Sequence, residues 1–560
     1  MKFAATQVSF LLLIVFLVTG HSAVALTETE RLASWAKIWG FLKYYHPEVA
    51  KGERDWDQQM ITLLPEVRMA ATPEELSTIY AKLLEQLGPV TNCKKCGSEE
   101  KISVWHRRNL DLSFLADSRM LTPALQQKLL HLKNNRNQQP NFYVKTRLPG
   151  VAHFSNEKYY EEMLFPSEEY RLLALFRYWN AIHYFFPYKY AIDRDWNQVL
   201  ETLIPLFKDA KDLRAYNSAL WQMVSSVQDS HSLFVAKSPE TLKAHRNVNG
   251  TGYISPYAIS FVGRKPVVSG FRNDSVAALG PLQLGDVITH LNHLPVDSII
   301  ERSKISIPAS NQATLLRSLK NTLLTGYTPE MDITFERNGR SVTQKLRLYR
   351  YNELRPKRNQ PAPAVSWVED GIAYVHMGNL KETQVDSTMQ SLMTSKAIIF
   401  DLRYYPQLTG FKIAPYLTSK KVVKTLATGP DFTFPGIFQS LKPAVIQPVK
   451  GVCYKGKVIM IMNEDTQSRG EYTVMLFKAS PRSMTVGSHT AGADGNVAYL
   501  PLPGGVEAVF TGLGVYYPNR QETQRVGLLP DIEVKPTIKG IKDQRDELLE
   551  KALQVARTEM

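Results

Sequence analysis

From Gly371 onward, short apolar segments alternate with helical segments, and this alternation is the strongest constraint on the fold. The apolar segments 372–377, 397–403 and 457–462 predict strands, and helical patterns lie between them or follow them. Alternating strands and helices predict a largely parallel sheet with crossover helices. In such sheets functional loops follow the C-terminal ends of the strands, so a site is expected in the loops after these segments.

One of these loops contains Ser468, between the predicted buried strand 457–462 and a predicted helix at 472–479. A serine at a strand-to-helix turn presents its hydroxyl beside the free N–H groups and positive dipole end of the helix. Those N–H groups are suited to hold a developing oxyanion. The alternative is that Ser468 is only the N-cap of the helix.

The N-terminal half contains two similar segments, 30–90 and 170–230. Trp39, Pro47 and Trp56 recur as Trp179, Pro187 and Trp196, at a constant offset of 140 (179 − 39). A constant offset without gaps indicates an internal duplication. Aromatic and aliphatic residues at helical spacing predict that each copy is a small helical bundle.

The two copies differ at their ends. The second ends in Gln228-Asp229-Ser230-His231-Ser232, where the first has Gly88-Pro89-Val90-Thr91. A polar Ser-His pair that is present in only one copy indicates a functional role in addition to packing. The alternative is that His231 caps the last helix or binds a carbonyl group.

Residues 250–350 predict a small β-rich module. Strands are expected at 257–262 and 265–269, and Asn338-Gly339 predicts a hairpin turn. The stretch 284–288, which contains Gly285 and Asp286, resembles PDZ domains. Such domains bind extended chain ends along a sheet edge, so the resemblance implies substrate binding near these two residues. The alternative is a structural barrel that binds nothing.

The N-terminus has the pattern of a secretory signal. Lys2 precedes an apolar run at 10–18, and Ala23-Val24-Ala25 is a small-x-small cleavage site. The run is too short to span a bilayer comfortably. We therefore expect cleavage after Ala25 and a periplasmic or secreted protein without a stable membrane span; an uncleaved anchor is the alternative.

The chain has only three cysteines, and Cys93 and Cys96 form a Cys-Lys-Lys-Cys pair. One such pair lacks the four ligands of a structural zinc site, so no metal is expected there. In an exported protein the pair indicates a local disulfide rather than redox catalysis.

The formal net charge is high, +14, but the basic residues are scattered among acidic ones. No Lys/Arg-rich run resembles a nucleic-acid-binding tail. We therefore expect no nucleic-acid partner.

Over about residues 170–540 the chain resembles the family of C-terminal processing peptidases, tricorn core proteases and retinoid-binding repeats. The motifs that carry the resemblance are, in chain order, 284–288, Phe400-Asp401-Leu402-Arg403, Ser468-x-x-Glu471, 487–490 and 527–534. Their order and spacing together are more specific than any one of them. The resemblance implies a C-terminal α/β catalytic domain of the crotonase-like ββα type.

The family has two catalytic types. One uses a Ser-Lys dyad in a Gly-x-x-Thr-x-Gly-Lys motif; here residues 487–493 match it, but Ala493 replaces the lysine. The other, tricorn-like type uses a Ser nucleophile, a His before the PDZ domain, a Ser beside that His, and a Glu late in the chain. The resemblance then implies Ser468 as nucleophile and His231 as base, oriented by Glu522 through Ser230.

For the oxyanion hole, the resemblance implies the N–H groups of Arg469 and Tyr404. The chain departs from the family here, because Tyr404-Tyr405-Pro406 stands where a Gly-rich turn is usual. No cofactor is needed, because the nucleophile, the base and the donors all come from the chain.

Together these patterns predict a multidomain α+β protein. The expected parts are a signal peptide (1–25), a helical domain (26–150), a second helical unit carrying Ser230-His231 (166–245), a PDZ-like module (250–355), a catalytic α/β domain (365–540) and a C-terminal helix (541–560). The expected function is that of an exported serine peptidase hydrolysing peptides or unfolded proteins. The alternative is a non-catalytic peptide-binding protein on the same fold.

Overall fold

The computed structural model describes residues 25–147, 150–249, 252–354 and 362–558. The expected signal peptide therefore lies outside the described residues, apart from Ala25. Within the described ranges, no helix is both long and apolar enough to cross a membrane.

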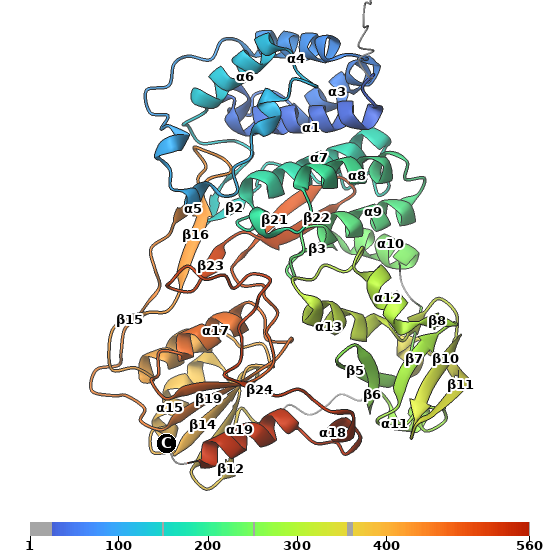
Figure 1. The fold of residues 1–560 in the computed structure, drawn as a ribbon, viewed down its shortest axis with the longest axis vertical. Helices are drawn as coiled ribbons and strands as arrows, with labels where there is room; N and C mark the ends of the chain where they lie inside the picture. Colours follow the sequence, from blue (N-terminus) through green and yellow to red (C-terminus); the bar gives the residue numbers. More distant parts are fainter. Residues whose placement is uncertain (1–24, 148–149, 250–251, 355–361, 559–560) are drawn as a thin grey trace, which may run out of the picture.

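Two sets of helices lie one above the other at the top of the molecule (Figure 1). The first set and its following segment comprise α1 (Glu28–Tyr45), α2 (Pro47–Ala50), α3 (Trp56–Met69), α4 (Pro73–Leu87), α5 (Val104–Arg107), α6 (Pro123–Asn134), β1 (Lys145–Arg147) and β2 (Val151–His153). The second set comprises α7 (Glu168–Phe185), α8 (Trp196–Lys208), α9 (Leu213–Ser225), β3 (Leu233–Ala236) and α10 (Pro239–Asn249). The starts of α1, α3 and α4 have the same spacing as those of α7, α8 and α9.

Each set is held together by a reciprocal pair of tryptophans. The Trp39 indole N–H donates to the Trp56 carbonyl at 2.9 Å, and the Trp56 indole donates back to the Trp39 carbonyl at 3.1 Å. Trp179 and Trp196 make the same two bonds at 2.7 and 3.1 Å. All four rings are buried, so these bonds satisfy indole groups that would otherwise be unpaired. The repeated tryptophans thus have the same packing role in both sets; their origin by duplication stays a prediction.

The two sets approach closely where α1 meets α7. Gly40 of α1 leaves room for Asn180 of α7, whose side chain is fully buried and donates to the carbonyls of Ala36 and Phe176, both at 2.9 Å. A Cβ atom at position 40 would lie 1.9 Å from the Asn180 side-chain oxygen. The absence of a side chain at Gly40 is therefore required by the packing.

Gly40→Ala is expected to lower the free energy of unfolding by about 1–3 kcal/mol, because the added methyl group overpacks this contact. Thermal unfolding followed by circular dichroism measures the effect. Gly97→Ala is the matched control, since a Cβ atom there meets nothing within 4 Å. Equal melting temperatures for the two variants would contradict the packing argument.

The predicted disulfide is present in the first helical region. Cys93 and Cys96 are bonded, with their Cα atoms 5.5 Å apart. Cys453 is a free thiol.

Residues 253–354 form a module with its own hydrophobic core. Its main sheet has the order β11-β10-β7-β6-β5. The elements are β4 (Tyr253–Ile254), β5 (Tyr257–Val262), β6 (Lys265–Phe271), α11 (Asp274–Ala277), β7 (Val287–Leu291), β8 (Leu294–Pro295), α12 (Val296–Ser303), α13 (Gln312–Thr322), β9 (Thr325–Gly326), β10 (Glu330–Arg337), β11 (Arg340–Arg347) and α14 (Tyr351–Leu354). The expected hairpin is confirmed, with Arg337 paired to Arg340 and positive φ at Asn338 and Gly339. The likeness of the module to PDZ domains stays a prediction.

The C-terminal domain is built on a sheet of order β12-β13-β14-β19-β20-β24. All neighbouring pairs from β13 to β24 are parallel, and β12 is antiparallel to β13, which confirms the predicted largely parallel sheet. The elements are β12 (Val365–Glu369), β13 (Ile372–His376), α15 (Val385–Leu392), β14 (Ala397–Asp401), α16 (Thr409–Ile413), β15 (Val422–Val423), β16 (Leu426–Pro430), β17 (Phe438–Ser440), β18 (Val445–Ile446), β19 (Lys457–Met462), α17 (Arg469–Phe477), β20 (Ser483–Gly487), β21 (Val497–Leu502), β22 (Val506–Thr511), β23 (Gly514–Tyr516), β24 (Ile532–Glu533), α18 (Ile538–Lys542) and α19 (Glu547–Arg557).

Helices cover both faces of this sheet. Alternate strand residues point to opposite faces, so Ile398 and Phe400 join the large core that includes α15 and α17, while Ile399 packs with α19. In the parallel register Asp401 of β14 lies beside Ile461 of β19. The loops that follow these two strands therefore start side by side, and the Thr466 hydroxyl donates to the Leu402 carbonyl at 3.0 Å.

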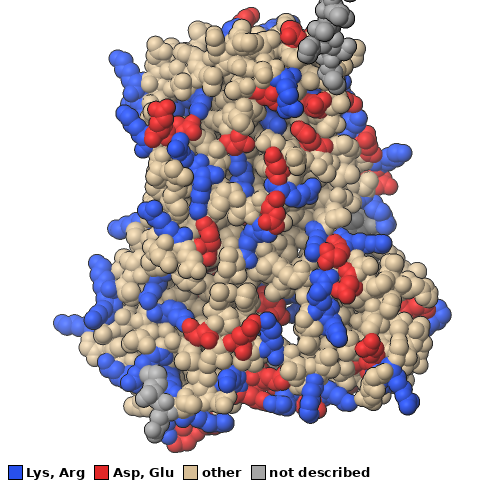
Figure 2. All heavy atoms as spheres, in the orientation of Figure 1, with Lys and Arg blue, Asp and Glu red and all other residues tan. Residues whose placement is uncertain are grey.

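Charged side chains are interleaved over the face of the molecule shown in Figure 2. Lys and Arg side chains alternate there with Asp and Glu side chains and with uncharged surface. On this face the excess of positive charge is not gathered into one patch.

Candidate active site

Ser468 lies at the turn between β19 and α17 and has an unusual backbone conformation. Its φ and ψ angles are +54° and −117°, whereas an ordinary N-cap residue is extended. Such a conformation is costly for a residue with a side chain and is found preferentially at functional sites. The Ser468 N–H is directed at the Ala493 carbonyl and the Glu471 carboxylate, both at 3.0 Å. Ser468 thus occupies the N-cap position of α17 in a strained geometry.

Glu471 holds the loop that faces Ser468. Its fully buried carboxylate accepts hydrogen bonds from the Thr490 hydroxyl (2.5 Å), the Gly492 N–H (2.8 Å) and the Ala493 N–H (3.1 Å), besides that of Ser468. Burial raises the pKa of Glu471, and these hydrogen bonds oppose that rise. The motif that would carry a catalytic lysine is therefore fixed beside Ser468 by a carboxylate, with Ala493 in the lysine position.

His231 reaches the C-terminal domain because the strand that follows it joins a sheet of that domain. In the antiparallel pairing of β3 with β22, Leu233 lies opposite Val509. This places His231 beside Thr511 at the end of β22, with 2.8 Å between the imidazole Nδ1 and the threonine hydroxyl.

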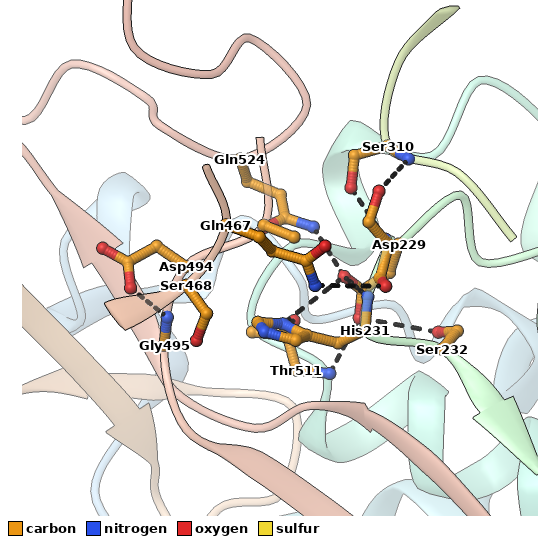
Figure 3. Close-up of polar contacts among 12 residues, drawn as sticks. Asp229, His231, Ser232, Ser310, Gln467, Ser468, Asp494, Gly495, Thr511 and Gln524 are labelled. Atoms are coloured by element: carbon orange, nitrogen blue, oxygen red, sulfur yellow. Dashed lines mark hydrogen bonds and ion pairs between the residues drawn. The ribbon is translucent and has the colours of Figure 1, made fainter. Parts of the chain in front are cut away.

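The structure brings His231 and Ser468 together. The Gln467 side-chain N–H donates to the Ser230 carbonyl at 3.3 Å, which joins the two segments next to the two residues. Figure 3 shows the Ser468 hydroxyl and the imidazole of His231 facing one another. No hydrogen bond between these two side chains is drawn there.

Asp229 is an acidic residue next to the imidazole, and no sequence pattern indicated a role for it. Its carboxylate is fully buried and accepts from the backbone N–H of Thr511 (2.8 Å), the backbone N–H of His231 (3.1 Å) and the Gln524 side chain (3.2 Å). Its nearer oxygen lies 3.9 Å from the His231 Nδ1. Asp229 thus fixes both His231 and the threonine that the imidazole contacts (Figure 3).

The charge state of His231 reflects these neighbours. Burial lowers the pKa of His231; the Asp229 carboxylate opposes this, and Arg317 of α13 adds to the lowering. A lowered pKa keeps the imidazole neutral near pH 7, which is the state a general base needs.

Ser230 and Glu522 do not form the relay that the family resemblance implied. The Ser230 hydroxyl accepts from the Ser310 N–H at 2.8 Å and donates to the Thr314 hydroxyl at 3.1 Å, so it points to the β-rich module. Glu522 accepts instead from Arg108 at 2.8 Å and from Tyr190 at 2.7 Å.

The geometry of the 516–524 segment explains the position of Glu522. Glu522 pairs with Tyr516 in an isolated β-bridge and turns toward Arg108, while Gln524, two residues later, reaches Asp229. The side chain of the 516–524 segment that approaches His231 is therefore the amide of Gln524. The carboxylate near His231 is that of Asp229.

The two expected oxyanion donors lie in different surroundings. Arg469 is the first residue of α17, so its N–H has no intrahelical acceptor. Its side chain donates to the Pro406 carbonyl at 3.3 Å and lies over the Tyr405 ring. The Tyr404 ring stacks on His376, and the residue is 44% exposed. The assignment of both N–H groups to an oxyanion hole stays a prediction.

Gly285 and Asp286 form a turn rather than an open binding surface. The Asp286 side chain is 2% exposed and binds Arg337 through two contacts of 2.8 and 2.6 Å. Gly285 has a φ of +87°, and a Cβ atom there would lie 2.9 Å from the Lys542 side chain of α18. The Asp286 carboxylate is thus paired, and the backbone N–H groups of Gly285 and Asp286 donate to the Val268 and Gln283 carbonyls at 2.9 and 3.1 Å, so these groups are already used within the module.

The comparisons with known proteins place the C-terminal domain in a family. Residues 371–534 match the model of peptidase family S41, and this part of the chain belongs to that family. The domain contains Ser468, Glu471 and Ala493, the residues that define one side of the site.

Solved structures are similar to this chain over more than its C-terminal domain. Mature CPAF complexed with lactacystin matches with a TM-score of 0.54 and 12% identity, over 70% of this chain and 98% of that chain. A second structure of mature CPAF gives 0.52 and 12%, over 70% and 97%. At this identity the likeness shows the fold alone. No curated protein matches the sequence.

Proposed function

We propose that the chain is an exported serine peptidase in which Ser468 is the nucleophile and His231 is the general base. The observation that carries the proposal is the strained serine at the start of α17, within an S41 domain, facing an imidazole delivered by another part of the chain. A serine hydroxyl becomes an effective nucleophile only when a positioned base removes its proton.

The reaction follows from this arrangement. The Nε2 atom of His231 accepts the Ser468 proton as the serine oxygen bonds to the scissile carbonyl carbon. The imidazolium then gives the proton to the leaving amine, and water hydrolyses the acyl-enzyme with His231 again as base. The Arg469 N–H at the helix N-terminus stabilises the oxyanion; one such donor typically contributes about 10²–10³ in rate.

Thr511 and Asp229 orient the base in this proposal. A hydrogen bond from the His231 Nδ1–H to the Thr511 hydroxyl leaves the lone pair of Nε2 for the serine. The buried Asp229 carboxylate fixes Thr511 and stabilises the imidazolium that forms. The Ser-Lys mechanism is not supported, because Ala493 occupies the position of the lysine.

The proposed substrates are extended peptides or unfolded proteins. Four exposed apolar residues lie in the loop and short helix after β14, namely Tyr404, Tyr405, Leu408 and Phe411, and they offer an extended chain an apolar surface. This surface adjoins the nucleophile, because Arg469 contacts Pro406 and Tyr405. The β-rich module is proposed to present chain ends to the site.

Incubation of unfolded β-casein with the mature chain, beginning at Leu26, tests the proposal. Peptides that appear with time, and fail to appear after pretreatment with a fluorophosphonate, are the expected result. Casein that is retained by the protein but stays intact would instead support the alternative, a peptide-binding protein on this fold.

A further inference from the structure

A cavity of about 720 Å³ opens between α4 and α6 in the first helical set. It is separate from the site described above: α4 and α6 lie at the top of the molecule in Figure 1, and α17 lies in the lower part. Its walls are mainly apolar, with Leu84, Pro89, Val90 and Leu132, and His46 also lines it. Its charged lining residues, Glu85 and Lys128, are exposed and pair with one another at 3.5 Å. The volume is within the range of small-molecule sites, about 300–1,000 Å³.

His46 gives this cavity one hydrogen-bonding group that the protein leaves unused. The residue is 1% exposed, and its Nδ1 accepts the Glu48 backbone N–H at 3.2 Å as the N-cap of α2. Because Nδ1 is an acceptor, the proton of the neutral ring is on Nε2. That Nε2 is buried and has no hydrogen-bond partner among the described residues. An unpaired buried donor destabilises the protein, so a ligand that supplies an acceptor removes this destabilisation.

The corresponding position of the second helical set holds an apolar residue. His46 directly follows α1, and Phe186 directly follows α7 in the same way. Phe186 is a buried apolar residue that packs in the core. The first set thus has an imidazole beside a cavity where the second set has an ordinary core side chain.

We propose that this cavity is a binding site for a small uncharged apolar molecule that carries a carbonyl oxygen, which accepts the Nε2–H of His46. The walls favour an apolar body, and a neutral donor suits a neutral acceptor, because burying an unpaired carboxylate is far more costly. Burial lowers the pKa of His46 to about 4, so the ring stays neutral under physiological conditions. The site is independent of the proposed peptidase reaction.

Prodan, an uncharged naphthyl ketone whose emission shifts to the blue in apolar surroundings, is a suitable probe. Titration of the full mature chain with Prodan is expected to give a saturable blue shift with one site. Ala124→Trp, which places an indole at a residue lining the cavity, is expected to weaken binding at least tenfold. Leu130→Trp is the matched control, because Leu130 is on the same helix and 39% exposed but does not line the cavity.

His46→Asn tests the donor itself. Asparagine places its side-chain oxygen where the imidazole has Nδ1, so it can accept the Glu48 N–H at the N-cap. Its NH2 group takes the place of ring Cδ2 and ends short of the position of the Nε2–H. Loss of one neutral hydrogen bond should weaken Prodan binding about tenfold while the melting temperature stays near that of the wild type. Ser468→Ala should bind Prodan like the wild type, which separates this site from the peptidase site. Absence of a saturable shift, equal binding by Ala124→Trp and Leu130→Trp, or unchanged binding by His46→Asn would overturn the proposal.

Discussion

Replacement of His231 by alanine is expected to slow casein hydrolysis and fluorophosphonate labelling at pH 7.5 by at least about 10³, since Ser468 then lacks the base that faces it. The stability of the fold should change little in comparison, because the imidazole contributes one side-chain hydrogen bond, to Thr511. Rates per folded molecule, measured with a time course of labelling, give the size of the effect.

The matched control for His231→Ala is His131→Ala, which removes an exposed imidazole from the first helical set. This variant should label at the wild-type rate. Free imidazole added to His231→Ala should restore part of the labelling, as an external base. Wild-type labelling by His231→Ala would remove His231 from the mechanism.

Asp229→Asn should lower the labelling rate by about 10² or more, although the asparagine is nearly the same size. Asparagine still offers one acceptor oxygen, but the negative charge beside the imidazole is lost. The Thr511 N–H would also lose its carboxylate acceptor, and with it the orientation of the threonine that contacts His231.

The pH dependence of the labelling rate separates a charge effect from a general loss of structure. Burial lowers the pKa of His231, and Arg317 adds to this lowering, while Asp229 raises the pKa. Without the Asp229 charge the pKa of His231 falls further. The acidic limb of the labelling profile in Asp229→Asn should therefore move to lower pH, even as the maximum rate decreases.

Glu522→Gln is the control for Asp229→Asn, because it removes the carboxylate charge that the family resemblance had implied. Glu522 binds Arg108 and Tyr190 in the structure, so labelling should stay within a few-fold of the wild type and the pH profile should not move. A large loss in Glu522→Gln together with a small loss in Asp229→Asn would reverse the assignment.

Local patterns predicted the elements around Ser468 well. The strand 457–462 was expected from its short apolar run and is β19, and the expected helix after Ser468 is α17. The Asn338-Gly339 turn was also expected, because both residues adopt the positive φ angles that such a turn requires. These predictions succeeded because the physical determinants lie within a few residues of one another.

The role of Asp229 could not be predicted in this way. Its carboxylate sits two residues before His231, but its partners are Thr511 and Gln524, which are 282 and 295 positions away in sequence. Those contacts depend on the pairing of β3 with β22. The prediction that Glu522 orients His231 failed for the same reason, because Glu522 binds Arg108, which is 414 positions away in sequence. The proximity of the His231 and Ser468 side chains was expected only from the family resemblance, since no local sequence pattern connects these two residues.

The PDZ-like stretch 284–288 shows that a motif can predict local secondary structure without predicting which groups are free to bind a ligand. Residues 284–288 lead into β7 as expected. The Asp286 carboxylate, however, is paired with Arg337, and Gly285 lies against Lys542. Both neighbours come from distant parts of the chain, so a pattern of five residues does not reveal them.

Labelling of the mature protein with a fluorophosphonate, followed by peptide mass spectrometry of the modified residue, identifies the nucleophile. We expect a single adduct on Ser468, absent from Ser468→Ala and strongly reduced in His231→Ala, with all three proteins equally folded. An adduct on another serine, or no adduct in folded wild-type protein, would contradict the assignment of Ser468 as the nucleophile.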